Sequence, residues 1–279
     1  MRPGSSTSDF PGVPDADDAA RHVLRTGFDL DAEAYQRTRP VFPAQAFDDL
    51  VRLAGLAPGD RIAEIGAGTG QASVPLAERG LAVTAVELGP SLAAVARRRL
   101  AAFPSCTAVT SAFEDWAAAD AAFGAVVAVN CLHWIDPAVR YAKPARLLRS
   151  GGAMIVGSSR WAQPRDAERF WADVQQDYRA VGLPGEPPPP PEAIEPWHFP
   201  ADATAFFTET ASLRYPFQLT YSAEDYLAQL STQSGPKVLG PERHAEFLSR
   251  VRDRLDSMGS PALTATFVGC LAIGRLSAR

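Results

Sequence analysis

Three glycines at alternate positions, Gly66, Gly68 and Gly70, separate a short apolar segment at 61–65 from a segment with helical spacing at 71–79. Glycine permits positive φ and lets a ligand approach the backbone, and the start of the following helix offers unpaired N–H groups. A strand, a glycine loop and a helix in this order are typical of a parallel α/β sheet with a nucleoside-cofactor site. This unit constrains the fold more than any other feature of the chain.

The alternation of strands and helices continues along the chain. The apolar pattern predicts strands at residues 82–86, 107–110, 123–129 and 152–157, and helices at residues 44–56, 90–102 and 138–148. The continuous apolar run at 123–129 is the pattern expected of a strand that is covered on both faces. Together these elements predict a doubly wound, Rossmann-like α/β sheet.

The C-terminal part has a different pattern. Helices are expected at residues 166–181, 223–230 and 241–255, and strands at residues 208–219 and 263–273. We expect the two strands to extend the sheet and the helices between them to form a cap. The predicted parts of the chain are a flexible tail (1–20), an N-terminal helical lid segment (21–56), the cofactor-binding Rossmann-like core (57–160), and a C-terminal part with the substrate cap and the last two sheet strands (161–279).

Charge and cysteine content restrict the partners. The 27 Lys and Arg residues and 32 Asp and Glu residues give a net charge of −5, which does not favour a phosphate-binding surface for nucleic acid. The three cysteines lack the short spacing of a zinc site or a disulfide framework, and no apolar run is long enough to cross a membrane. We expect a cytoplasmic monomer or homodimer that binds a small molecule, without metal, nucleic acid or membrane.

The spacing of the glycines separates three classes of cofactor loop. A dinucleotide fingerprint needs a glycine at position 71, which is Gln71, and no G-x-x-x-x-G-K phosphate loop is present. The remaining pattern is E-x-G-x-G-x-G, which begins at Glu64. Glu87 ends the next predicted strand, where a carboxylate can accept hydrogen bonds from both ribose hydroxyls. The glycines could instead form only a tight turn, and Glu87 could be only a solvated strand end. The glycine loop and Glu87 together nevertheless favour a cofactor site.

Four stretches resemble the successive motifs of class I methyltransferases that use S-adenosyl-L-methionine (SAM): RIAEIGAGTGQAS, AVTAVELGPSLAAVARRRL, FGAVVAVNCLHWIDP and LLRSGGAMIVG. The resemblance is close from residue 32 to residue 156 and looser beyond. AYQRTRPVFP and HWIDP are similar to segments of the bacterial small-molecule branch that includes trans-aconitate methyltransferase-like proteins. The resemblance implies a seven-stranded sheet whose last strand is antiparallel.

The resemblance also implies which residues bind SAM and its product, S-adenosyl-L-homocysteine (SAH). They are Glu64 and the backbone of Gly66, Ala67, Gly68 and Gly70 for the amino-acid end, Asn130 for the methionine part, Glu87 for the ribose, and Leu88, Ala112 and Phe113 around the adenine. Many family members carry Asp at the position of Ala112, where it bonds the adenine amine. Ala112 cannot form this bond, so either Glu114, Asp115 or water takes the role, or the adenine pocket is less polar.

Methyl transfer from a sulfonium needs an acceptor held close and in line, and a base only where the acceptor holds its proton tightly. His133 follows the fourth strand of the core and is a candidate general base, although it could instead pack under the lid. Tyr35 is the second catalytic candidate, because it could touch the methyl group. The substrate-binding candidates are Arg39 (for an anionic substrate or the SAM carboxylate), Trp134 as an aromatic wall, and the cap residues Trp197 and His198, with ordinary core packing as the alternative for the aromatic ones.

The leading hypothesis is a SAM-dependent methyltransferase that transfers a methyl group to O, N or C of a small-molecule metabolite, with aromatic acceptors and secondary metabolism among the options. A SAM-bound enzyme that catalyses cyclisation or rearrangement is the first alternative. A tRNA or protein methyltransferase and a non-catalytic SAM-binding subunit are weaker alternatives. The acidic balance counts against tRNA, and the intact glycine loop counts against a non-catalytic subunit.

Overall fold

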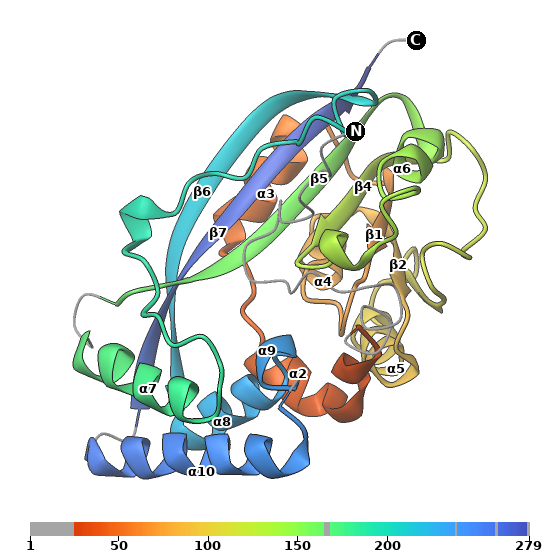
Figure 1. The fold of residues 1–279 in the computed structure, drawn as a ribbon. Coiled ribbons are helices and arrows are strands. Elements are labelled where there is room, and N and C mark those ends of the chain that lie inside the picture. Colours follow the sequence, from red (N-terminus) through yellow and green to blue (C-terminus); the bar gives the residue numbers. More distant parts are fainter. Residues whose placement is uncertain (1–24, 165–167, 238, 260–261, 278–279) are drawn as a thin grey trace, which may run out of the picture.

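One mixed sheet of seven strands runs through the computed structural model of the chain, which describes residues 25–164, 168–237, 239–259 and 262–277 (Figure 1). The strands are β1 (Arg61–Ile65), β2 (Ala82–Glu87), β3 (Thr107–Thr110), β4 (Phe123–Val129), β5 (Leu148–Ala162), β6 (Phe207–Ser222) and β7 (Ala262–Leu276). Their order across the sheet is β3-β2-β1-β4-β5-β7-β6. The strands β1 to β5 are parallel, and β7 is antiparallel to both of its neighbours. The predicted Rossmann-like α/β fold with an antiparallel last strand is confirmed.

Helices cover both faces of this sheet. One face carries α3 (Ala44–Leu53), α4 (Ser73–Glu78) and α5 (Pro90–Leu100), and the other carries α6 (Ala142–Leu147). The remaining helical elements are η1 (Gly27–Asp31), α2 (Ala32–Thr38), η2 (Leu132–Trp134), α7 (Glu168–Ala180), η3 (Pro191–Ala193), α8 (Ala223–Ser231), α9 (Ser234–Lys237) and α10 (Pro241–Ser257). The central strand β4 is buried on both faces, as its continuous apolar sequence predicts.

Most predicted boundaries shift by one or a few residues in the structure, and the shifts of α3, α6 and β5 have a clear cause. α3 ends at Leu53, because Gly55 adopts a left-handed conformation (φ +62°) and its N–H turns back to the carbonyl of Arg52. α6 begins at Ala142, which keeps Pro144 within the first turn, where a missing N–H costs little. β5 continues to Ala162, because it pairs with β7 that far although its last residues are not an apolar run.

The lid segment and the cap meet beyond the carboxyl ends of the parallel strands. α2 packs against both α5 and α8, so segments far apart in the sequence lie side by side there (Figure 1). α7, α8 and α10 form the cap and bury their apolar residues against the ends of β6 and β7. The predicted tail at 1–20 and the first residues of the lid segment, 21–24, lie outside the described residues. The predicted division at residue 160 falls inside β5, so the cap is built on the same sheet as the core.

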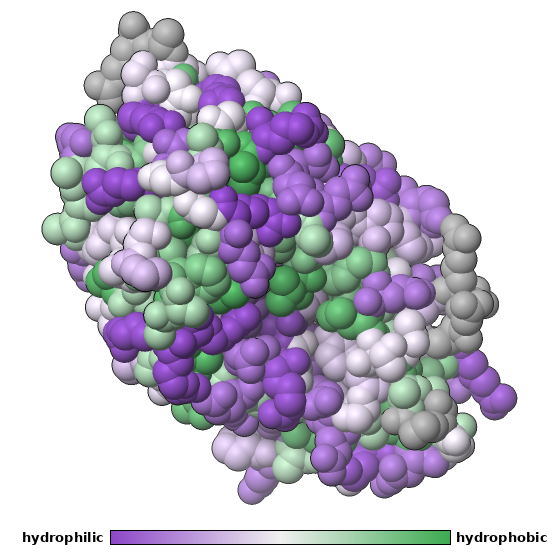
Figure 2. Space-filling model, turned by 180° about the vertical axis from the view of Figure 1, so that it is seen from behind, coloured by the Kyte–Doolittle hydropathy of each residue, from purple (hydrophilic) through white to green (hydrophobic). Residues whose placement is uncertain are grey.

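The surface seen from behind mixes hydrophilic and apolar residues, with hydrophilic side chains around and between the apolar areas (Figure 2). Leu30 on η1 and Met258 after α10 are the large apolar side chains that stay exposed among the described residues. Single exposed apolar residues are ordinary on a protein surface. Among the described helices, none combines the length and the apolarity that a membrane span requires.

Candidate active site

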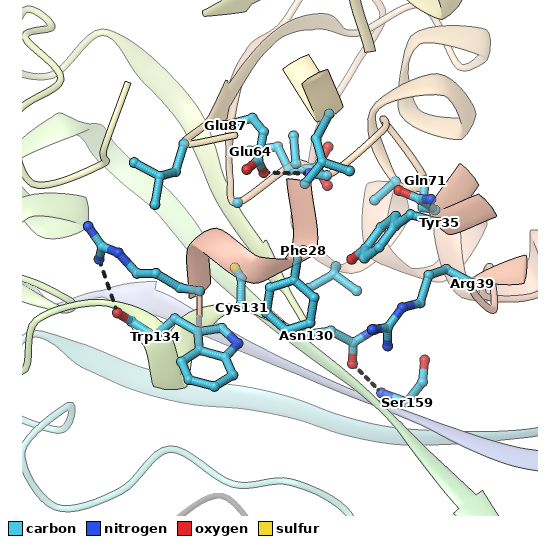
Figure 3. A pocket seen from close by; sticks show the side chains of 18 of the residues that line it. Phe28, Tyr35, Arg39, Glu64, Gln71, Glu87, Asn130, Cys131, Trp134 and Ser159 are labelled. Carbon is cyan, nitrogen blue, oxygen red and sulfur yellow. Dashed lines mark hydrogen bonds between the residues drawn. The ribbon is translucent and has the colours of Figure 1, made fainter. Parts of the chain in front are cut away.

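A cavity of about 480 Å³ lies where the carboxyl ends of β1, β2 and β4 face the lid segment and the cap (Figure 3). Ligands of doubly wound sheets bind at this edge, and the volume is in the range of small-molecule sites. The glycine loop, η1, α2, α8 and the end of β5 complete its lining. Most of the predicted site residues meet in this cavity.

The glycine loop reaches its shape only with glycine at two of its positions. Gly66 and Gly68 have φ values of +58° and +57°. A Cβ at Gly66 would lie 2.6 Å from the Cβ of Cys131, and a Cβ at Gly68 would lie 3.2 Å from the ring of Tyr35. The loop is therefore pressed between β4 and the lid, and its backbone lines the cavity directly.

Replacing Gly66 with alanine is expected to lower the free energy of unfolding by about 3 kcal/mol, the sum of a left-handed alanine and a steric overlap. Gly151→Ala is the matched control, because Gly151 also has positive φ (+72°) but no atom within 4 Å of its Cβ position. This control should cost only about 1–2 kcal/mol. Denaturant unfolding measures both values, and equal destabilisation of the two variants would contradict the steric argument.

Glu64 near the end of β1 is a buried carboxyl group that lines the cavity. Its side chain is hydrogen-bonded to the hydroxyl of Ser73 at the start of α4. Burial raises the pKa of Glu64 to about 8, although the Ser73 hydrogen bond opposes the shift. The group is therefore mostly protonated at neutral pH without a ligand, and a nearby cationic group would favour its ionised form.

Glu87 at the end of β2 braces the glycine loop. Its two carboxylate oxygens accept hydrogen bonds from the N–H groups of Gly68 and Gly89, each at 2.8 Å. Burial raises the pKa of Glu87, and these two backbone hydrogen bonds oppose the rise. Each oxygen retains acceptor capacity, so bracing the loop and binding ribose hydroxyls are compatible.

The predicted adenine side of the cavity contains Leu88, Ala112, Phe113 and Glu114, whereas Asp115 is exposed and outside the lining. Oε1 of Glu114 accepts hydrogen bonds from Arg25 (2.8 Å) and from the N–H of Asp136 (3.2 Å). Oε2 of Glu114 is buried and has no hydrogen-bond partner among the described residues. Burial by itself would raise the pKa of Glu114. Hydrogen bonds, including the one from Arg25, outweigh this effect, so the pKa of Glu114 is lowered. Of the two acidic alternatives to Ala112, Glu114 is the one that faces the cavity.

Four aromatic or polar side chains stand in the middle of the cavity: Tyr35, Asn130, His133 and Trp134. Burial raises the pKa of Tyr35 and lowers that of His133 to about 4, so both side chains are uncharged at neutral pH. Asn130 adopts φ +57°, and its Oδ1 accepts a hydrogen bond of 2.6 Å from the N–H of Ser159. This bond ties the end of β4 to β5.

Three predicted site residues lie away from the cavity lining. Gly70 shapes the start of α4, where its carbonyl accepts a hydrogen bond from Val74. Trp197 packs on Phe199 and on the face of β7 opposite the cavity, and His198 is exposed and pairs with Glu209 at 2.7 Å. Because side chains alternate across a strand, the segment that carries Trp197 and His198 covers the wrong face of β7 for substrate contact. The structure therefore places both residues outside the cavity, and their role in substrate binding stays a prediction from the sequence.

The sequence did not single out several residues that line the cavity. They are Phe28 and Phe42 near the lid, Ser159 and Trp161 on β5, Gln229 on α8 and Phe267 on β7. They come from five separate parts of the chain, and only Phe42 lies within a stretch quoted above, AYQRTRPVFP. Only the pairing of β5 with β7 and the position of the cap bring them together.

Comparisons with known proteins agree with this fold. Residues 63–156 match a family model described as a methyltransferase domain. An uncharacterized methyltransferase of Mycobacterium tuberculosis (strain ATCC 25618 / H37Rv) is 33% identical over 169 residues, which are 60% of this chain and 64% of that protein. A demethylmenaquinone methyltransferase of Tropheryma whipplei (strain Twist) is 29% identical over 167 residues, 58% of this chain and 67% of that protein. The chain thus spans less than two thirds of the mycobacterial relative's length.

Solved structures show the same fold. A candidate type II methyltransferase from Anaeromyxobacter dehalogenans superposes with a TM-score of 0.58 at 23% identity, over 85% of this chain and 97% of that one. The strand order and the antiparallel β7 define the class of the fold: it is a Rossmann-like α/β fold that this chain shares with a solved methyltransferase structure. The residues that match the methyltransferase-domain model, 63–156, contain the glycine loop and the strands β2, β3 and β4.

Proposed function

We propose that the chain is a SAM-dependent methyltransferase that transfers a methyl group to a small molecule. The observation that carries this proposal is the pair of buried carboxyl groups, Glu64 and Glu87, which face the glycine loop inside one cavity. Burying a carboxylate is costly unless a charge or hydrogen-bond donors compensate it. A nucleoside ligand with hydroxyls and positive charge supplies both kinds of compensation.

The described residues fit SAM along the cavity. Glu64, with its raised pKa, favours a cationic group such as the α-ammonium of an amino acid. Glu87 can accept from ribose hydroxyls, while Leu88 and Phe113 offer apolar surface to a purine ring. When bound, SAM would supply an electrophilic methyl group on a sulfonium.

Glu114 is proposed to accept the hydrogen bond of the adenine amine, because its Oε2 is a buried acceptor that lacks a donor. Wild type should therefore bind SAH at least about tenfold more tightly than S-inosylhomocysteine, which carries an oxygen in place of that amine. Glu114→Gln should lose this preference, since a glutamine amide can also donate to the inosine oxygen. Competition binding measures the ratio, and Asp115→Asn is the matched control. An unchanged preference in Glu114→Gln would remove Glu114 from the cofactor site.

The chain's own residues would act mainly by positioning the acceptor and excluding water. His133 can accept a proton because it is neutral, but a pKa of about 4 makes it a weak base. Tyr35 keeps its proton, because burial raises its pKa. These properties favour an acceptor that is nucleophilic without removal of a tightly held proton.

Two observations support a small molecule as the acceptor. Residues of the lid segment and the cap line the cavity together with the sheet edge, and one relative's name gives demethylmenaquinone, a small molecule, as what that protein methylates. Membership of the trans-aconitate methyltransferase-like branch, a cytoplasmic location and a monomeric or homodimeric state remain predictions from the sequence.

Calorimetric titration with SAH, followed by incubation with methyl-labelled SAM and candidate acceptors, tests the proposal. We expect one SAH site per chain and a product that gains the mass of one methyl group. No SAH binding at millimolar concentration would reject the proposal. A SAM-dependent product without added methyl mass would favour the cyclisation or rearrangement alternative.

A further inference from the structure

One end of the cavity has hydrogen-bond donors that the protein itself does not use. Nε of Arg39 and Oγ of Ser159 are buried without a hydrogen-bond partner among the described residues, and both side chains line the cavity. Figure 3 shows them at the same end, away from Glu64 and Glu87. Buried donors without acceptors are costly, so this end is suited to a ligand that brings acceptors.

Arg39 also brings a positive charge that no carboxylate of the described residues neutralises. Its Nη2 donates to the carbonyl of Thr232 in the cap, and its guanidinium lies 4.8 Å from the ring centre of Tyr35 and 5.6 Å from that of Phe28. The other arginine in the lining, Arg25, is paired with Glu114. A partly buried cation among aromatic rings is stabilised by an anionic ligand.

A wall of rings lies next to these donors. Phe42, Trp161 and Phe267 line the cavity, and the rings of Trp161 and Phe267 are 4.5 Å apart. Phe42 lies flat on the sheet because Gly157 and Gly269 leave room for it. A Cβ at either glycine would come within 3.2 Å of its ring. This surface suits a planar apolar ring.

We infer that these five residues, Arg39, Phe42, Ser159, Trp161 and Phe267, form an acceptor subsite for a molecule with a planar apolar ring and an anionic oxygen group, either a carboxylate or a ring oxyanion. The inference rests on the proposed function, because it assigns this end of the cavity to the methyl acceptor. The ring packs on the aromatic wall, and the anionic oxygen accepts from Arg39 and Ser159. These two residues orient the acceptor, and no proton transfer is assigned to them.

The carboxylate of the cofactor is the other source of such an anion. Tyr35 lies between Arg39 and the glycine loop, where the amino-acid end of the cofactor would bind. One edge of its ring approaches Gly68, and the guanidinium of Arg39 lies over its face and donates to the cap. Arg39 therefore stands on the cap side of Tyr35, which favours the methyl acceptor over the cofactor as its partner.

The test is calorimetric titration of the SAH-loaded protein with naphthoate, naphthamide and cyclohexanecarboxylate. Naphthoate should bind at least about tenfold more tightly than its neutral isostere naphthamide, because only naphthoate accepts charge-assisted hydrogen bonds. It should also bind more tightly than cyclohexanecarboxylate, which lacks a planar ring. Arg39→Met should weaken naphthoate binding about tenfold or more, and Ser159→Ala about threefold or more.

Arg37→Met is the matched control, because Arg37 is exposed and pairs with Asp225 on the surface. It should leave naphthoate binding unchanged. A second arm compares SAH with 5′-methylthioadenosine, which lacks the amino-acid part, and Arg39→Met should affect neither by more than about threefold.

Three results would overturn the inference while leaving the proposed function intact. They are equal binding of naphthoate and naphthamide, no naphthoate binding to a protein that does bind SAH, and an Arg39→Met variant that loses SAH affinity but keeps affinity for 5′-methylthioadenosine. The last result would assign Arg39 to the cofactor carboxylate. Failure of wild type to bind SAH at all would reject the proposed function and this inference with it.

Discussion

Glu87→Ala is expected to weaken SAH binding by about a hundredfold or more. The substitution removes the acceptor proposed for the ribose hydroxyls and also the brace that holds the N–H groups of Gly68 and Gly89. Hydrogen bonds to charged groups contribute about 1.5–3 kcal/mol each. The loss of two of them is enough for a hundredfold change, which corresponds to about 2.8 kcal/mol.

Calorimetric titration with SAH measures this change directly. Glu78→Ala is the matched control, because Glu78 is exposed on α4 and does not line the cavity. Glu87→Gln should give an intermediate affinity, since the amide keeps one acceptor oxygen. If Glu87→Ala bound SAH as tightly as wild type, the glycine loop would serve only the fold, and the cofactor assignment would have to be rebuilt.

SAM binding is expected to release close to one proton from Glu64 at neutral pH. Burial raises the pKa of Glu64 to about 8 in the ligand-free protein, so the group is mostly protonated at pH 7. A cationic ligand favours the carboxylate and lowers its pKa in the complex. The affinity contributed by Glu64 should therefore rise with pH, by up to about tenfold per unit, and level off above its ligand-free pKa.

The same raised pKa has the opposite effect on the stability of the ligand-free fold. Between the unfolded pKa of a glutamate, about 4.3, and the folded value of about 8, the folded chain binds the proton more tightly than the unfolded chain. The contribution of Glu64 to stability is thus fully present below this window and decreases as the pH rises through it.

Calorimetry in buffers of different ionisation enthalpy counts the protons released. Glu64→Gln is the decisive comparison, because it keeps a similar shape but cannot titrate. The ammonium group of the ligand titrates near pH 8 as well, but it contributes equally to both proteins, so the difference between them isolates Glu64. An identical proton count in the two proteins would show that Glu64 does not respond to the cofactor.

Local sequence determined the frame of the cofactor site. The alternation of apolar runs with helical segments indicated every strand of the core. The signal is strongest for β1 and β4, because a strand buried on both faces needs continuous apolar residues. The glycine loop, Glu64 and Glu87 follow one another within a single strand–loop–helix–strand unit, so short-range geometry alone brings them together. The predicted cofactor residues other than Gly70 line the cavity, and Ala112, Phe113 and Asn130 reach it because they follow β3 and β4 at the same edge of the sheet.

Of the proposed acceptor subsite, the sequence indicated only Arg39, and the tertiary structure decided the rest. Ser159 and Phe267 come from strands more than a hundred positions apart in the chain, and they share the cavity only because β5 pairs with β7. Trp197 and His198 looked equally suitable in the sequence, but their segment covers the opposite face of β7. Aromatic composition does not say which face of a strand a residue will cover, because that depends on register, which long-range pairing sets.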